Sequence, residues 1–339
     1  MKVGFVAPLG IAAVNGGVRT QALQTAEALG KLNVEVDFVS PWQEGIEVDI
    51  THVFVAGPDT LGILRRCSEL GIKTVLSPVF FSNRSATTIA SSLKAEKMLS
   101  KVGSGIRSDF GIKAEACQIA DLVLPNTPAE AELIEKGFEI NSSKILVVPN
   151  GVETRFKNST TDSFIKKYGF KDFVLFVGQA GAPRKNVIKL LEVAPKIKAP
   201  IVIIGSLYDD EYGQQCKKLA NTAGNITFID TIDHDSELLS SAYAACHTFV
   251  LPSKYETPGI AAMEAALAGA NIAITEKGGT RDYFKDWVEY LNPQSNDSIV
   301  KAVNLSLRKK KSQDLKNHIL NHYSWGEIGR RTLDAYNKL

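Results

Sequence analysis

Two carboxylates, Glu256 and Glu264, interrupt an otherwise apolar and alanine-rich stretch that runs from Thr248 to Ala270. A buried carboxylate is costly unless it has partners, and the hydroxyl groups of a sugar or of a ribose would be suitable ones. The alternative is that Glu256 is solvated and that Glu264 pairs with a lysine from a neighbouring element. These residues alone leave both interpretations open.

The residues around the two acids predict a strand followed by a helix. The apolar run 249–251, closed by Pro252, is typical of a buried strand end. Thr257 and Pro258 have the residue types of an N-cap and of a first helical position. Glu264 is then the seventh helical residue, roughly 9 Å along the axis at 1.5 Å per residue. Because a helix N-terminus carries free amides and a positive dipole end, it also suits a phosphate group.

A pair of cations, Arg184 and Lys185, opens another predicted helix. The run 172–177 predicts a strand that ends at Gly178, and a short loop leads from there to the two cations. Cations at a helix N-terminus are unfavourable to the helix itself, because the dipole there is already positive. A site that holds a diphosphate would justify them, whereas the alternative is two exposed basic residues at a loop tip. Their position after the carboxyl end of a strand favours binding.

The glycine pair Gly16 and Gly17 follows the first predicted strand, 2–7, and precedes an amphipathic helix. Strand, glycine loop and helix form the typical opening of a doubly wound domain. The loop matches neither the GxGxxG nor the Walker pattern. Absent side chains would let a ligand approach the backbone, and a tight turn without a ligand is the alternative.

Composition excludes several classes of protein. The chain has 339 residues, 44% hydrophobic and 22% charged, with a net charge of +2, so we expect about two soluble domains and no attraction to nucleic acid. Its four cysteines are scattered and its five histidines do not cluster with them, which argues against disulfides and zinc and for a reducing compartment. The apolar run 3–14 contains Pro8 and Gly10, so we interpret it as mature structure rather than as a signal peptide.

The chain alternates strand and helix patterns, which predicts α/β architecture with parallel sheets covered by helices on both faces. The turn-forming residues 148–152, followed by the polar run 153–163, mark the expected domain boundary. The segment 84–113 differs from its surroundings, with six Lys or Arg and two acids, a local charge of 6 − 2 = +4. Its apolar residues at helix-like spacing are Ile89, Leu93, Leu99, Val102 and Ile106. A basic amphipathic helix can lie on an anionic membrane surface, but a solvated helix face is the commoner explanation.

Four motifs in order resemble those of one family, the retaining glycosyltransferases of the GT-B fold, sequence family four (glycosyl transferases group 1). They are the Pro-Ser…Glu-x7-Glu pattern at Pro252, Ser253, Glu256 and Glu264, the hinge 148–152, the pair Lys185 and Asn186, and the closing Ser324 and Trp325. The resemblance implies two Rossmann-like doubly wound parallel-sheet domains that face each other across a cleft. It places an acceptor-side domain at 1–152, a nucleotide-sugar-binding domain at 153–323, and a helix at 324–339 that crosses back to the first domain.

The resemblance also implies roles for individual residues. Lys185 would neutralise a diphosphate, Glu264 would accept hydrogen bonds from ribose hydroxyls, and Glu256 would hold sugar hydroxyls near the anomeric carbon. The remaining donor-binding positions would be Ser253, the amides around Gly259 and Ile260, the pair Gly16 and Gly17, and Gln179. Gln179 stands where the family usually has an arginine, and Arg184 is expected to supply the missing charge. Ser77 and Pro78 stand where the family often has a histidine.

The expected function is therefore a retaining, metal-independent hexosyltransferase-type reaction without a cofactor. The donor would be a nucleotide-diphosphate sugar, and the acceptor a hydroxyl group of a glycan, a lipid-linked molecule or another compound. We expect a cytoplasmic protein, with peripheral membrane contact through 84–113 as an additional expectation. Two alternatives are a catalytically silent GT-B protein that binds a nucleotide or scaffolds a partner, motivated by Gln179 and Ser77, and a sugar-nucleotide epimerase.

Overall fold

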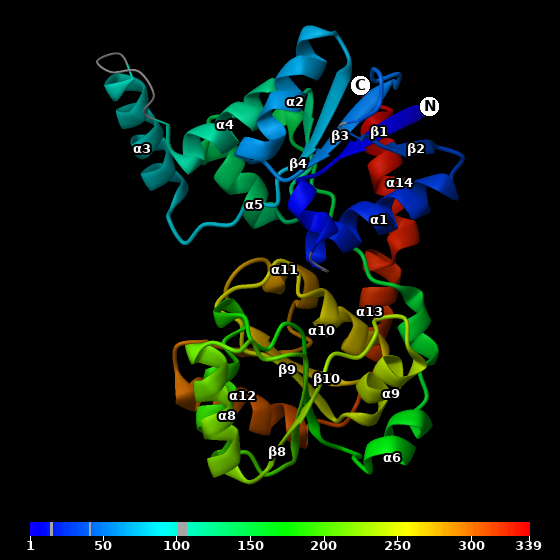
Figure 1. The fold of residues 1–339 in the computed structure, drawn as a ribbon, viewed down its shortest axis with the longest axis vertical. Coiled ribbons are helices and arrows are strands. Elements are labelled where there is room, and N and C mark those ends of the chain that lie inside the picture. Colours follow the sequence, from blue (N-terminus) through cyan, green and yellow to red (C-terminus); the bar gives the residue numbers. More distant parts are fainter. Residues whose placement is uncertain (14–15, 41, 101–106) are drawn as a thin grey trace. The chain divides into compact units, whose positions relative to one another are not determined.

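The computed structural model describes residues 1–13, 16–40, 42–100 and 107–339. It divides into two compact units (Figure 1). Unit 1 comprises Met1–Gly151 together with Trp325–Leu339, and unit 2 comprises Val152–Ser324. The domain boundaries expected from the sequence fall after residues 152 and 323.

Unit 1 contains a five-stranded parallel sheet in the order β2-β1-β3-β4-β5. Its strands are β1 (Lys2–Val6), β2 (Glu35–Phe38), β3 (Ile50–Phe54), β4 (Lys73–Ser77) and β5 (Leu122–Val123). Every residue of β3 is buried, whereas the edge strand β2 is partly exposed. This burial is what a central parallel strand requires, because helices cover both faces of such a sheet.

The helices of unit 1 come from both ends of the chain. They are α1 (Gly17–Gly30), α2 (Pro58–Glu69), α3 (Ala86–Leu99), α4 (Asp109–Ile119), α5 (Pro128–Glu132) and α14 (Trp325–Tyr336). Shorter helical turns lie at Leu9–Ala12, Leu133–Gly137 and Ser142–Lys144. The C-terminal helix α14 packs against α1, so the last segment of the chain completes the core that the first segment begins.

A buried polar cluster ties α14 to the sheet of unit 1. His52 in β3 is 2% exposed, and its Nδ1 lies 2.6 Å from Tyr336 Oη while its Nε2 lies 2.9 Å from Ser77 Oγ. Burial lowers the pKa of His52 to about 3, so the ring is neutral and can donate one hydrogen bond and accept the other. Ser77, which the sequence marked as a departure from the family pattern, is a partner in this cluster.

Unit 2 contains a six-stranded parallel sheet in the order β11-β10-β9-β6-β7-β8. Its strands are β6 (Val174–Val177), β7 (Ile201–Ile204), β8 (Ile226–Ile229), β9 (Thr248–Leu251), β10 (Asn271–Thr275) and β11 (Glu289–Leu291). All residues of β7 and β9 are buried. Their continuous apolar sequences are therefore explained by burial on both faces.

Helices cover both faces of this second sheet (Figure 1). One layer contains α7 (Val187–Val193), α8 (Glu211–Ala223) and α12 (Asn296–Arg308). The other contains α6 (Asp162–Tyr168), α9 (Glu237–Ala245), α10 (Ile260–Leu267) and α13 (Gln313–Tyr323). Helix α11 (Thr280–Phe284) and the turns Thr154–Asn158, Pro183–Lys185 and Ala194–Lys196 complete the unit. The predicted α/β class with doubly wound parallel sheets is confirmed.

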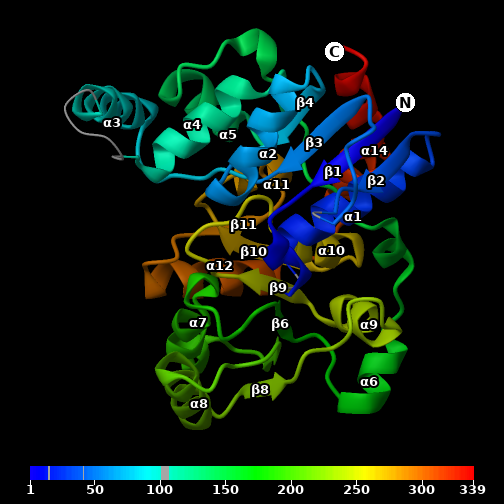
Figure 2. The same cartoon turned by 45° about the horizontal axis from the view of Figure 1, so that its top comes forward.

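Each sheet has a point where the strand order reverses. In unit 1 the chain runs from β1 to β2 on one side and then continues through β3 on the other. In unit 2 it runs from β6 to β7 and β8, and then returns to place β9 on the opposite side of β6 (Figure 2). Ligands of open α/β sheets bind outside the carboxyl ends of the strands at such a switch point. A ligand site in unit 2 is therefore expected at the loops after β6 and β9.

The basic segment 84–113 is not one amphipathic helix in the described residues, because it contains α3 and the start of α4. The predicted apolar positions Val102 and Ile106 lie outside the described residues. Several cations of the segment have partners: Lys94 lies 3.0 Å from Glu139, Arg107 pairs with Glu115, and Lys113 pairs with Asp109. The guanidinium of Arg84 lies 5.6 Å from the ring centre of Phe110. Acids within and outside the segment thus offset part of its positive charge.

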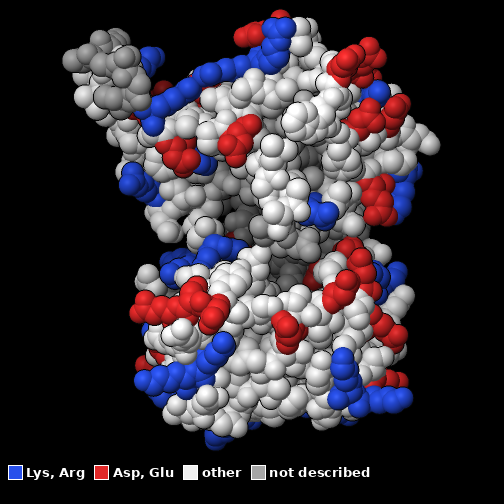
Figure 3. All heavy atoms as spheres, viewed as in Figure 1, with Lys and Arg blue, Asp and Glu red and all other residues white. Residues whose placement is uncertain are grey.

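The charged surface is mixed in sign. On the face drawn in Figure 3, both basic and acidic side chains occur on each unit, as the net charge of +2 leads one to expect. Among the residues that the structure describes, no helix has both the length and the apolar character needed to cross a bilayer.

Candidate active site

The first cluster of the site forms where the loops after β6 and β9 meet. Lys185 ends the short turn Pro183–Lys185 in the connection that follows β6, and Glu256 lies in the connection that follows β9. The two strands are parallel neighbours, so their carboxyl ends share one edge of the sheet. The sequence-predicted cation and acid are therefore brought together at the switch point.

Three side chains converge on one oxygen of Glu256. Lys185 Nζ lies 2.7 Å from Oε1, Ser253 Oγ donates to the same atom at 2.6 Å, and Arg184 Nη1 lies 3.5 Å away. Glu256 is 5% exposed and Ser253 is fully buried. All three of these contacts are made with Oε1.

The charge of Glu256 is determined by two opposing effects. Burial alone would raise the pKa of this carboxyl, but the nearby charges of Lys185 and Arg184, with hydrogen bonds from Lys185 and Ser253, outweigh it. The pKa of Glu256 is therefore held below its ordinary value, and the group is ionised at neutral pH. The interpretation of Glu256 as a solvated carboxylate is wrong, because the side chain is buried against two cations.

Hydrogen bonds to backbone carbonyls fix the loops that carry this cluster. Asn186 follows Lys185 with a φ of 58°, and its Nδ2 donates to the carbonyls of Pro252 and Pro293, each at 2.9 Å. The amide of Lys254 donates to the carbonyl of Arg184 at 2.9 Å. The loop after β6 is thus bonded directly to the loop after β9, and the relative positions of Lys185 and Glu256 do not depend on their side chains alone.

Arg184 belongs to the same cluster through a second set of contacts. Its Nη1 donates to the carbonyl of Tyr255 at 3.0 Å, and its guanidinium lies 5.3 Å from the centre of the Tyr255 ring. Gln179 lies earlier in the same loop, where its carbonyl accepts a hydrogen bond from the amide of Ala182 at 3.0 Å. A cation is therefore present beside Glu256, supplied from five residues beyond Gln179.

The helix after Glu256 begins later than the sequence predicted. The N-cap is Gly259, with a φ of 88°, and α10 starts at Ile260 rather than at Pro258. A left-handed φ cannot continue a right-handed helix, and glycine adopts it without a steric penalty. Thr257 is therefore not the cap, and Glu264 is the fifth helical residue, about 6 Å from the start. The amides of Ile260 and Ala261 belong to the first turn, where the helix itself provides no acceptor.

Glu264 forms a second cluster, inside α10 and 4% exposed. Its Oε1 lies 2.8 Å from His234 Nε2, and its Oε2 accepts a hydrogen bond from Tyr243 Oη at 2.7 Å. His234 follows β8, and Tyr243 lies in α9. The alternative that a lysine pairs with Glu264 is wrong: the partners are a histidine and a tyrosine.

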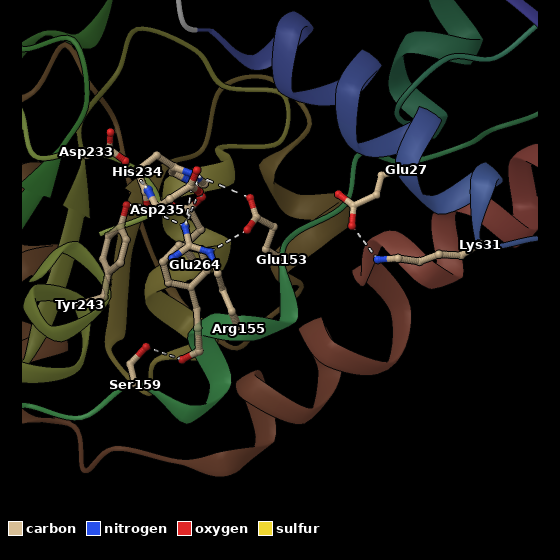
Figure 4. Close-up of polar contacts among 11 residues, drawn as sticks. Glu27, Lys31, Glu153, Arg155, Ser159, Asp233, His234, Asp235, Tyr243 and Glu264 are labelled. Atoms are coloured by element: carbon tan, nitrogen blue, oxygen red, sulfur yellow. Dashed lines mark hydrogen bonds and ion pairs between the residues drawn. The ribbon is translucent and has the colours of Figure 1, made fainter. Parts of the chain in front are cut away.

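The far side of His234 faces a small network of charges (Figure 4). Arg155 Nη2 donates to the carbonyl of His234 at 2.6 Å and lies 3.2 Å from Nδ1 of its ring, while Arg155 Nε donates to Glu153 at 2.7 Å. Nδ1 also lies 3.4 Å from Asp235 Oδ1 and 3.7 Å from Glu153 Oε1. The hydrogen bond to Glu264 raises the pKa of His234 to about 9, although burial and Arg155 act in the opposite direction.

The same network contains a group of potential metal ligands. Donor atoms of Glu153, His234 and Asp235 lie within 4.8 Å of one another. However, Arg155 bonds to Glu153 and lies within 3.6 Å of Asp235, and the raised pKa of His234 favours a protonated ring. A protonated imidazole cannot ligate a metal, and a guanidinium already supplies positive charge here. This group is better explained as an ion-pair network than as a metal site.

Sequence reasoning missed His234, Tyr243 and Arg155. A weak signal existed for His234, which comes after the carboxyl end of a predicted strand and could have been placed at the same edge as Lys185. Tyr243 is a single hydroxyl in an alanine-rich helix, and Arg155 lies in a polar connection, so neither has a spacing that identifies a partner.

The predicted pair Gly16 and Gly17 lies in unit 1, at the start of α1. Gly16 is the N-cap in an extended conformation, with a φ of −150°, and a Cβ built there would meet no atom within 4 Å. The loop residues just before it, 14–15, lie outside the described residues, so the ligand-binding and tight-turn interpretations of the pair both stay predictions. Open space beside the backbone is compatible with an approaching ligand.

Comparisons with known proteins agree with this architecture. Residues 159–320, nearly all of unit 2, match the family model "Glycosyl transferases group 1". The match covers 320 − 159 + 1 = 162 of the 339 residues, and it is to the same family that the sequence motifs resemble. The GT-B fold of the chain is shared with the sucrose-phosphate synthase of Thermosynechococcus elongatus, at a TM-score of 0.77 and 16% identity over 99% of this chain and 98% of that one. A second structure, HepE of Anabaena in complex with UDP and glucose, gives a TM-score of 0.73 at 14% identity over the full length of both chains.

The curated relatives match over only part of their length. The uncharacterized glycosyltransferase MJ1607 of Methanocaldococcus jannaschii is 25% identical over 241 residues, covering 66% of this chain and 60% of its own. The D-inositol 3-phosphate glycosyltransferase of Geodermatophilus obscurus is 27% identical over 239 residues, covering 64% of this chain and 51% of its own. The matched region thus spans a little over half the length of these relatives.

Proposed function

We propose that this protein is a retaining glycosyltransferase that moves a hexose from a nucleoside-diphosphate sugar to a hydroxyl group of a glycan, a lipid-linked molecule or another acceptor. The observation that carries the proposal is the convergence of Lys185 and Arg184 on the buried carboxylate of Glu256. This cluster stands at the switch point of the unit 2 sheet, where ligands of such sheets bind.

Lys185 can bind a diphosphate while it keeps its hydrogen bond to Glu256. An ammonium group has three N–H donors, and one of them is directed to Glu256 Oε1 at 2.7 Å. The other two can reach phosphate oxygens, together with the guanidinium of Arg184 and the first amides of α10. Glu256 Oε2 would then accept from a hydroxyl of the donor sugar, and Glu264 from the ribose.

The proposed reaction breaks the bond between the anomeric carbon and the β-phosphate oxygen, and the electron pair leaves with the phosphate. The acceptor oxygen forms the new bond on the same face, and its proton passes to the departing phosphate, so the configuration is retained. Negative charge grows on the leaving oxygen as the bond breaks. Fixed cations at that position stabilise the transition state more than the ground state, which is the condition for faster turnover.

We further propose that the reaction needs no metal ion, because Lys185, Arg184 and a helix N-terminus already supply positive charge to the leaving group. Turnover that persists after exhaustive treatment with EDTA is the expected result. Loss of turnover with EDTA that is restored by Mg²⁺ or Mn²⁺ would contradict metal independence without contradicting transfer.

The test of the main proposal is a transfer assay with UDP-, GDP-, ADP-, CDP- and TDP-sugars and a panel of hydroxyl acceptors, starting from UDP-glucose. Wild-type protein is expected to release nucleoside diphosphate and form a glycoside. Lys185→Met and Glu256→Gln should each lower turnover by about 10²–10³-fold, the effect typical of losing one group that stabilises developing charge. Lys189→Met is the matched control, since Lys189 lies in α7 and pairs with Glu192 at 2.7 Å.

The alternatives give different outcomes in the same assay. A silent GT-B protein binds nucleotide without releasing product, and an epimerase converts the donor without an acceptor. Turnover that is unchanged by Lys185→Met and Glu256→Gln would contradict the assigned site.

We propose separately that the protein is cytoplasmic and contacts a membrane surface peripherally. Helix α3 carries Lys94 and Lys97, and its last two residues, Met98 and Leu99, are 71% and 54% exposed. An exposed apolar tip beside cations favours an anionic lipid surface. Cosedimentation with phosphatidylglycerol vesicles but not with phosphatidylcholine vesicles, weakened by the double substitution Met98→Ser and Leu99→Ser, is the expected result. Equal recovery with both vesicles would contradict it.

A further inference from the structure

The buried carboxylate of Glu264 is held by two donors that the proposed function does not yet use. His234 donates to one oxygen and Tyr243 to the other, at 2.8 and 2.7 Å. An ionised carboxylate offers about four acceptor positions, two on each oxygen. Two of the positions are therefore occupied by the protein, which leaves one on each oxygen for a ligand with two neighbouring hydroxyl groups.

We propose that His234 is a positioning residue for the nucleotide: together with Tyr243 it fixes the Glu264 carboxylate so that its two remaining acceptor positions receive the 2′- and 3′-hydroxyls of the ribose. The inference rests on the proposed function, because it concerns the same donor site. His234 acts through Glu264 and does not touch the reacting atoms.

The surroundings of His234 hold its ring in place. Arg155 bonds to the carbonyl of His234 at 2.6 Å, and Phe156 contacts both rings of the pair, with centroids 5.8 Å from that of His234 and 5.5 Å from that of Tyr243. Figure 4 shows Tyr243 on one side of this group and Glu153 on the other. The ring is thus oriented by groups from three separate segments before any ligand arrives.

The donation to Glu264 does not depend on the charge of the ring. In the imidazolium, both nitrogens donate, and Nδ1 faces Asp235 and Glu153. In the neutral form, Nε2 keeps its proton on Glu264, while Nδ1 can accept from Arg155 Nη2 at 3.2 Å. Either state offers Glu264 the same donor, and the raised pKa of His234, about 9, reflects that bond. The positioning role therefore holds throughout the neutral range.

A merely structural role and a positioning role predict different ligand preferences. Loss of structure would weaken the binding of all nucleotides equally. A misplaced carboxylate would mainly weaken the binding of nucleotides that carry both ribose hydroxyls. The experiment is calorimetric titration of UDP, 2′-deoxy-UDP and 3′-deoxy-UDP, with GDP and ADP and their deoxy forms as further probes, into wild type and four variants. The variants are His234→Ala, His234→Gln, Tyr243→Phe and His247→Ala.

Wild type is expected to bind the ribonucleotide about tenfold or more tightly than its deoxy forms, as for a lost hydrogen bond to a charged group. His234→Ala and Tyr243→Phe should reduce this ratio several-fold, and His234→Gln should restore much of it because its amide can donate to Glu264. His247→Ala should leave the ratio unchanged, since His247 is half-buried at the amino end of β9 and contacts Thr248. Thermal unfolding of each variant checks that it is folded.

Two results would overturn the inference alone: a ratio that His234→Ala leaves unchanged, or affinities for all forms that fall by the same factor. Wild-type protein that binds none of the nucleoside diphosphates would contradict the proposed function and, with it, the role of His234.

Discussion

Glu256 and Glu264 are both buried acids, but different groups satisfy them. Two cations and a serine hydroxyl surround Glu256, whereas an imidazole and a phenol hold Glu264. The first arrangement concentrates charge at one point, and the second fixes orientation. This difference is consistent with the proposed roles, in which Glu256 contacts the donor sugar beside the diphosphate and Glu264 binds the ribose hydroxyls.

The ion pair between Lys185 and Glu256 gives the first prediction at the residue scale. Lys185→Met and Glu256→Gln should each lower the free energy of unfolding by about 1–3 kcal/mol, because each leaves a buried polar partner less well satisfied. The double variant should be more stable than the sum predicts, by about 1 kcal/mol or more, since the groups are in direct contact. Urea unfolding of wild type, the two single variants and the double variant measures this coupling. Additive losses would contradict a stabilising interaction between Lys185 and Glu256.

His234 gives the second prediction, on pH. The pKa of its ring is raised from the ordinary 6.5 to about 9, chiefly by the hydrogen bond to Glu264. The folded protein therefore holds this proton more tightly than the unfolded chain. The resulting stabilisation is complete below pH 6.5 and is lost as the pH rises through 9.

Urea unfolding between pH 6 and pH 10 measures this pH effect. Relative to His234→Gln, wild-type protein should lose stability over that interval. Parallel curves for the two proteins would show that the imidazolium contributes nothing to folding.

Residue types and spacing were enough to select Glu256 and Glu264 as candidates, because acids in an apolar stretch require an explanation. Arg184 and Lys185 were selected because cations are unfavourable at a predicted helix start. Residue types and spacing were not enough to find His234, Tyr243 or Arg155. Those three side chains reach Glu264 or its partner from segments that are 21 to 109 residues away along the chain (264 − 243 = 21; 264 − 155 = 109). Only the sheet order brings them together.

At the scale of the elements, the turn that carries Glu256 depends on a close backbone approach. The amide of Glu256 donates to the carbonyl of Lys277 at 3.0 Å, and the amide of Gly279 donates to the carbonyl of Glu256 at 2.9 Å. Gly278 lies between them with a φ of 96°, and a Cβ built there would be 2.1 Å from the carbonyl oxygen of Glu256. A side chain at this position would displace the turn.

The third prediction compares two glycines with similar positive φ angles, 91° at Gly269 and 96° at Gly278. Gly269 has a φ of 91° and open space around its Cβ direction, so Gly269→Ala should cost only about 1–2 kcal/mol, the penalty of a left-handed residue. Gly278→Ala has the same conformational penalty and also displaces Glu256. This variant should therefore lose more stability than Gly269→Ala, and most of its transferase turnover. Urea unfolding and the transfer assay measure both effects. Equal stability and equal turnover in the two variants would contradict the proposed importance of this turn.

The order of strands and helices was accessible from the sequence because buried parallel strands have continuous apolar runs, as in β7 and β9. The start of α10 was not. Thr257 and Pro258 have the residue types of a helix start, but the turn that holds Glu256 continues to Gly259. Tertiary contacts of the turn with residues 277–279 thus override the local preference.

At the scale of the whole molecule, unit 1 is built from the two ends of the chain. Its core includes residues of α14 as well as of β1 and α1. His52, Ser77 and Tyr336 form the buried polar contact of this arrangement. This polar contact could not be predicted from the sequence, since a histidine and a tyrosine separated by 284 residues have no detectable pattern.

This contact gives the fourth prediction. Tyr336→Phe removes the hydroxyl that lies 2.6 Å from His52 Nδ1 and leaves a fully buried ring nitrogen without that partner. The free energy of unfolding should fall by about 1–3 kcal/mol. Tyr168→Phe is a suitable control, because Tyr168 is a half-buried tyrosine at the end of α6 in unit 2. Equal stability of the two variants, measured by urea unfolding, would contradict a stabilising role for the cluster.

The most direct test of the account is an experimental structure of this protein with a bound nucleoside diphosphate, UDP being the first to try. We predict phosphate oxygens within hydrogen-bonding distance of Lys185 Nζ and both ribose hydroxyls on the carboxylate of Glu264. A well-ordered nucleotide that contacts neither residue, or that binds elsewhere on the chain, would contradict it.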